Sequence, residues 1–169
     1  TGKMRRLIWP VLFLLLMLLQ GAASAFYTGW LSFDLPLLAL YAFAMLRGER
    51  QGALVGLGVG LLQDAMTVGV FGYHILTRMG VGYAIGLMKE KVVKDNTVFH
   101  MAVIALCSLG LRFVYWWLEL VRSGGRWSIF FSFMVDSLGF IVGNMLLVVP
   151  VVLVVRRIYQ WIKEEDISY

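Results

Sequence analysis

The chain has 169 residues, of which 60% are hydrophobic and only 15% are charged, and its formal net charge is +5. A soluble domain of this length would need a larger polar share to cover its surface. The basic residues stand in small groups between apolar stretches, which is typical of membrane topology signals and excludes a nucleic-acid partner. We therefore predict a single all-α integral membrane domain over residues 1–169, with residues 1–3 an addition before a native start at Met4.

The first apolar segment covers residues 7–25 and follows the basic pair Arg5 and Arg6. Together with Ala23-Ser24-Ala25, this pattern also resembles a secretory signal with a cleavage site. The apolar run continues to Tyr27, however, which favours a retained first membrane helix. We expect the segment to stay in the protein.

Five further apolar segments follow, at about residues 30–46, 52–64, 72–88, 98–121 and 129–155. About 20 apolar residues make one crossing of a bilayer. In the second segment, Asp34 stands at a helix N-cap position and Pro36 falls in the first turn. Pro150 should kink the last helix. We predict a bundle of six transmembrane helices, although the short second and third segments leave a five-crossing or re-entrant arrangement open.

The distribution of basic residues predicts the orientation. With six crossings, one side receives eleven Lys and Arg residues and the other receives two. Positive charge accumulates on the cytoplasmic side, so both termini should be cytoplasmic. The eleven are Lys3, Arg5, Arg6, Arg47, Arg50, Lys89, Lys91, Lys94, Arg156, Arg157 and Lys163; the two are Arg122 and Arg126.

Small and charged residues form matching stripes on the third and fourth segments. Such glycines let two helix backbones approach closely, and an unpaired charge in hydrocarbon is costly. Because the two segments are antiparallel neighbours, we expect Asp64 and Arg78 to pair or to share one polar network. Whether this pair serves function or only holds the hairpin together is left open. The stripes consist of Gly52, Gly56, Gly60 and Asp64, and of Arg78, Gly82 and Gly86.

A second polar group is predicted on the last two segments. Arg112 and Glu119 are seven residues apart and project from nearly the same helical face. The sixth segment adds a close-packing glycine pair and two polar residues, which could line a cavity beside the kink or belong to ordinary bundle packing. These residues are Asp136, Gly139, Gly143 and Asn144.

No motif indicates catalysis, a metal site or a cofactor. The sequence has no phosphate-binding loop, no HExxH and no Gly-x-Ser-x-Gly. Cys107 is the single cysteine, and His74 and His100 lie in different segments without metal-ligand spacing. We expect a protein that is not an enzyme.

The glycine-rich stretch at residues 56–64, which ends in Asp64 and is followed by Gly69, Gly72 and His74, resembles the signature region of the MreD family of rod shape-determining proteins. The Asp-Leu-Pro-Leu-Leu segment beginning at Asp34, the Gly-Tyr-x-x-Gly pattern at residues 82–86, and the basic start before a leucine-rich helix are also similar. Gln63 departs from the usual hydrophobic residue before the aspartate.

The resemblance implies a non-enzymatic multi-pass protein of the bacterial cytoplasmic (inner) membrane. It implies a direct partner, MreC, and a shared machinery with the glycosyltransferase RodA, a class B penicillin-binding protein and MreB filaments. The family fold is similar to the S components of energy-coupling-factor vitamin transporters.

Two functions therefore compete. The first is a scaffold of the cell-elongation machinery (the elongasome) that controls peptidoglycan synthesis with MreC and contacts it through lipid-facing helices, for which the glycine stripes are candidate surfaces. The second is a substrate-binding S component for a vitamin or another small molecule. A ligand pocket needs a loop long enough to close it, and the predicted outer connections are short, which favours the scaffold.

Overall fold

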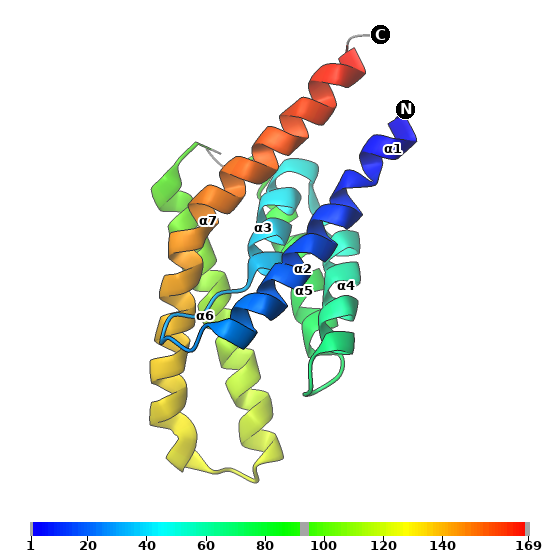
Figure 1. The fold of residues 1–169 in the computed structure, drawn as a ribbon. Coiled ribbons are helices and arrows are strands. Elements are labelled where there is room, and N and C mark those ends of the chain that lie inside the picture. Colours follow the sequence, from blue (N-terminus) through cyan, green and yellow to red (C-terminus); the bar gives the residue numbers. More distant parts are fainter. Residues whose placement is uncertain (1, 92–94, 168–169) are drawn as a thin grey trace. The chain divides into compact units, whose positions relative to one another are not determined.

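The computed structural model describes residues 2–91 and 95–167, and within these ranges it contains helices and turns but no strand (Figure 1). The all-α prediction is confirmed. Six helices have 13 residues or more, and they occupy the six predicted segments. The helices are α1 (Gly2–Arg6), α2 (Ile8–Phe26), α3 (Leu35–Arg47), α4 (Glu49–Met66), α5 (Tyr73–Leu87), α6 (Thr97–Arg122) and α7 (Phe130–Ile167), with a 3₁₀ turn at Trp127–Ile129.

Three helical stretches, Lys3–Phe26, Thr97–Arg122 and Trp127–Lys163, are long and apolar enough to cross a membrane. The protein is thus a membrane protein by the length and composition of these helices. Helix α3 is apolar but has 13 residues, about 20 Å, and the hydrocarbon core is about 30 Å thick. The six crossings and the orientation stay predictions, and Lys94, one of the basic residues counted for the orientation, lies outside the described residues.

One expected boundary is met and another is not. Helix α3 begins at Leu35, directly after the expected cap position Asp34 and within the predicted segment 30–46, and Pro36 is its second residue. Proline suits the first turn, because its fixed φ is helical and its missing N–H has no intrahelical partner there. Helix α7 continues through Pro150 to Ile167, well beyond the expected end at residue 155.

The chain divides into two compact units. The first contains α1 to α5 together with the part of α7 that starts at Pro150. The second contains Gly29–Asp34, α6 and the part of α7 that precedes Pro150. The hairpin with the predicted stripes belongs to the first unit, and the second predicted polar group belongs to the second.

Helix α3 is the core of the first unit. No side chain at residues 37–45 is more than 4% exposed. The helix is apolar on every face, as a fully enclosed helix must be. The ring of Phe43 packs edge-to-face against Trp9 and Phe13 of α2, with centroids 4.9 and 6.2 Å apart. The backbone N–H of Leu35 donates to Oε1 of Gln20 at 2.9 Å, so a side chain of α2 satisfies one of the free donors at the start of α3.

Helices α4 and α5 form an antiparallel hairpin whose backbones touch at the predicted glycines (Figure 1). A Cβ atom added to Gly52, Gly56 or Gly60 would overlap a backbone carbonyl of α5. The same holds in reverse for Gly82, where a Cβ would overlap the carbonyl of Gly52. Close backbone approach of this kind replaces the hydrophobic drive that helices lack in lipid.

We expect Gly56→Ala to destabilise the protein and Gly58→Ala to leave it intact. A Cβ on Gly56 would meet the backbone of Arg78 and Met79, whereas one on Gly58, on the same helix, has nothing within 4 Å. Overpacking costs about 1–3 kcal/mol, and alanine in an open helical position gains up to about 1 kcal/mol over glycine. Thermal unfolding of the purified protein in mild detergent measures both changes. Equal melting temperatures for the two variants would contradict the packing described.

Candidate functional site

The conspicuous polar cluster of the first unit lies where α4 ends and α5 begins. Asp64 stands in the last turn of α4, and its side chain is 1% exposed. Gly72 precedes α5 as its N-cap with φ of 101°, in the left-handed region that glycine adopts without strain. Because glycine has no side chain, Gly72 cannot itself cap the first turn of α5.

The Asp64 carboxylate provides that cap from the neighbouring helix. Its Oδ2 accepts hydrogen bonds from the backbone N–H groups of Gly72 at 2.8 Å and Ile75 at 3.1 Å. Its Oδ1 accepts from the backbone N–H of His74 at 3.1 Å and lies 2.8 Å from the ring Nδ1 of His74. An ionised carboxylate only accepts, so Nδ1 carries the proton in this contact. The negative charge also faces the positive end of the α5 dipole, which stabilises it.

Arg78 is engaged by the residue next to Asp64. The guanidinium is buried, and its Nε donates to Oε1 of Gln63 at 3.0 Å. Its Nη1 lies 3.3 Å from Oγ1 of Thr77, which in turn donates to the carbonyl of Tyr73. The structure therefore brings Asp64 and Arg78 into one region, because Arg78 bonds to Gln63, the residue before Asp64. The available signal for Gln63 was a polar side chain beside a carboxylate, directly after the apolar and glycine residues 52–62 of the same helix.

The second unit contains a buried amide that joins three segments. Asn144 of α7 is fully buried; its Nδ2 donates to Oγ of Ser108 on α6 at 2.9 Å, and its Oδ1 accepts from the backbone N–H of Asp34 at 2.9 Å. Asp34 was expected as a cap for α3 and as a family-motif position. No pattern in the sequence pointed to Ser108, because a serine in an apolar helix commonly bonds its own backbone instead.

The glycine pair of α7 packs against an extended segment and not against another helix. A Cβ on Gly139 would overlap the carbonyl of Trp30, and one on Gly143 would overlap that of Ser32. The N–H of Ser32 donates to the carbonyl of Gly139 at 3.4 Å, and the indole of Trp30 donates to the carbonyl of Val135 at 2.9 Å. Glycine permits this approach for the same reason in both cases, because there is no side chain to keep the chains apart.

Arg112 and Glu119, which were expected on nearly the same face of α6, have different partners in the structure. The guanidinium of Arg112 donates from Nε to Oγ of Ser137 at 3.1 Å and lies over the ring of Phe133, with 4.6 Å from Cζ to the centroid. Glu119 lies 3.7 Å from Arg122, one turn further along α6, and Asp136 is exposed. The three charges thus have different surroundings.

These contacts hold helices and segments together. Within residues 3–91 and 95–163, whose side chains the structure describes, every buried side-chain nitrogen and oxygen has a hydrogen-bond partner. The same ranges contain no group of three His, Cys, Asp or Glu residues placed to hold a metal ion. Gly69, the remaining motif position, has open space around it.

Replacing Asp64 should loosen the α4–α5 hairpin. Asp64→Ala leaves the N–H groups of Gly72, His74 and Ile75 without their acceptor, and we expect a loss of about 2 kcal/mol in unfolding free energy. Asp64→Asn keeps one acceptor oxygen and should lose less. Asp136→Ala, at an exposed carboxylate on α7, is the control. Detergent-solubilised protein followed by thermal unfolding separates the three, and an Asp64→Ala melting temperature equal to that of the control would refute the capping role.

A family model described as rod shape-determining protein MreD matches residues 2–162. No curated protein and no solved structure matches the chain. The match covers nearly the whole sequence and includes both polar clusters and the glycine hairpin. The resemblance seen in the residues at 56–74 is thereby confirmed, and the chain belongs to the MreD family of rod shape-determining proteins.

Proposed function

We propose that the chain is a non-catalytic membrane scaffold of the bacterial cell-elongation machinery, which partners MreC to control peptidoglycan synthesis and rod shape. The observation that carries this proposal is the family match over residues 2–162. RodA, a class B penicillin-binding protein and MreB filaments act in the same machinery, and only MreC is proposed as a direct partner.

The proposed location is the cytoplasmic membrane, which the chain crosses several times. Three long apolar helices support it. In the first of them, only 11% of an 18-residue apolar stretch is buried within the protein. Side chains such as Leu14 and Leu18 of α2, which are 50% and 58% exposed, need lipid or a partner helix to cover them. The positive-inside count supports cytoplasmic termini.

A scaffolding role agrees with how the polar residues are used. Asp64 caps a helix, and Asn144 joins three segments, so both are engaged within the chain. The fold this produces is braced by internal bonds at both polar clusters. A protein that organises other membrane proteins needs such a defined outer surface.

The structure changes which surface we propose for MreC. The glycine faces that could have received a partner helix are covered by the chain's own backbone. The backbone of α5 covers Gly52, Gly56 and Gly60, and that of Ser32 covers Gly143. The exposed apolar faces of the long helices, and α2 above all, are the better candidates for contact with the transmembrane helix of MreC.

Affinity purification from a native host in mild detergent tests the partner. We expect MreC to be recovered in stoichiometric amount with the tagged chain. Substitution of Leu14 and Leu18 by alanine should weaken this recovery, because it removes exposed apolar area on α2, whereas the matched change of Leu106 and Leu109, exposed on α6, should not. An unchanged yield of MreC in the α2 variant would overturn the proposed contact surface.

A second measurement tests the function itself. Depletion of the chain should turn rod cells round, and expression of the wild-type protein should restore their shape. Cells that keep their shape during depletion, or a purified complex that contains a pair of ATPases and a bound vitamin, would favour the S-component alternative instead.

A further inference from the structure

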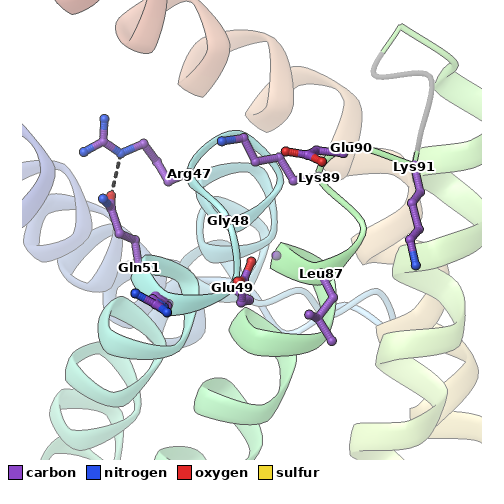
Figure 2. A pocket seen from close by; sticks show the side chains of 10 residues that line it. Arg47, Gly48, Glu49, Gln51, Leu87, Lys89, Glu90 and Lys91 are labelled. Carbon is purple, nitrogen blue, oxygen red and sulfur yellow. Dashed lines mark hydrogen bonds between the residues drawn. The ribbon is translucent and has the colours of Figure 1, made fainter.

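A pocket of about 630 Å³ lies at the end of the α4–α5 hairpin opposite to Asp64 (Figure 2). The junction between α3 and α4 forms one wall with residues 47–51, and the end of α5 with the turn behind it forms the other with residues 86, 87 and 89–91. All of these residues belong to the first unit. The pocket is thus a hollow between two turns at one end of the hairpin.

Basic side chains dominate this pocket. It is lined by two carboxylates, Glu49 and Glu90, and by twice as many cations, namely Arg47, Arg50, Lys89 and Lys91. Within the two described ranges, no ion pair joins either carboxylate to these cations. The lining therefore has an excess of positive charge that is not neutralised inside the protein.

One of the cations, Arg47, is held in place by its neighbours. Its Nε donates to Oε1 of Gln51 at 2.6 Å (Figure 2). Its Cζ lies 5.9 Å from the centroid of the Tyr159 ring. A held cation loses less conformational entropy when an anion binds to it.

Two glycines, Gly48 and Gly86, are among the residues that line the pocket. Gly48 has a φ of 94° and links α3 to α4, and a Cβ on Gly86 would overlap the backbone of Glu49. Gly48 gives the first turn of α4 no side-chain cap. This turn adds a positive dipole end to the cationic lining. Topology alone requires basic residues at a helix end, but it does not require them to surround one hollow.

We propose that this pocket binds a phosphate group, supplied by the headgroup of an anionic phospholipid. Phosphate matches the chemistry of the lining. One guanidinium group can bind two oxygens of a phosphate at once, and lysines add point charges. The positive-inside count assigns the four cations of the pocket to the cytoplasmic side. The anionic lipids of that membrane surface attract Lys and Arg side chains. Leu87, which is 49% exposed at the rim, offers apolar surface to the start of an acyl chain. A soluble phosphate compound has the same recognition chemistry, and the test separates the two sources.

The test uses the full chain in a neutral detergent and measures lipid binding by native mass spectrometry and by thermal stabilisation. The probes are phosphatidylglycerol, phosphatidylcholine as a neutral-headgroup lipid, and inorganic phosphate. The pocket variant is Arg50→Gln, Lys89→Gln, Lys91→Gln. The matched control is Arg6→Gln, Arg157→Gln, Lys163→Gln, which removes the same charge from the same predicted side but outside the pocket. Arg47 is left unchanged because it contacts Gln51 and Tyr159.

We expect the wild type and the control variant to retain phosphatidylglycerol in preference to phosphatidylcholine. The pocket variant should bind phosphatidylglycerol about tenfold more weakly or worse. Equal losses in the two triple variants would mean diffuse surface attraction and would overturn the site, as would no loss in either. Stabilisation by inorganic phosphate that equals that by the lipid and disappears in the pocket variant would support the phosphate site but assign it to a soluble compound.

Discussion

The contact between the backbones of α4 and α5 is the constraint on which much of the first unit depends. In lipid, two apolar helices gain little by leaving the hydrocarbon, so their association depends on close packing and on hydrogen bonds. Gly52 and Gly82 face each other so closely that neither can carry a Cβ. That approach also brings the last turn of α4 beside the first turn of α5. The Asp64 carboxylate can reach the free N–H groups there only because the helices are so near.

The same contact explains how the protein tolerates buried charge. Asp64 is stabilised by three N–H donors, by His74 and by the helix dipole, and Arg78 by the amide of Gln63. A buried carboxylate without such partners would be strongly unfavourable. The second unit follows the same principle with a neutral group, because Asn144 satisfies the backbone of an extended segment that no helix or sheet would otherwise pair. In both units a polar side chain is used to fix a backbone segment, which suits a protein that presents a defined surface to partners.

The two ends of the hairpin differ in charge and in their proposed roles. At one end the Asp64 carboxylate is enclosed and satisfied by the chain itself. At the other end, four cations surround a hollow that the chain does not fill. The glycine contacts run from one end to the other, with Gly60 near the acidic end and Gly86 at the basic end. A ligand at the basic end would therefore bind to the same packed hairpin that Asp64 closes, and it would stabilise the folded hairpin by mass action.

The class of the protein could be predicted from the residues alone, as could the approximate positions of the six longer helices and the stripes of α4 and α5. These features depend on local hydropathy and on the 3.6-residue period, which short stretches of sequence encode directly. Which groups meet depends on the tertiary structure. It placed Gly139 and Gly143 against the extended segment at Trp30 and Ser32, and it gave Gln63 and Ser108 their buried partners. It also enclosed the short helix α3 on every side. Such pairings join residues far apart in the chain, with 110 positions between Asp34 and Asn144, and depend on the packing of whole segments, so no local pattern in the chain predicts them.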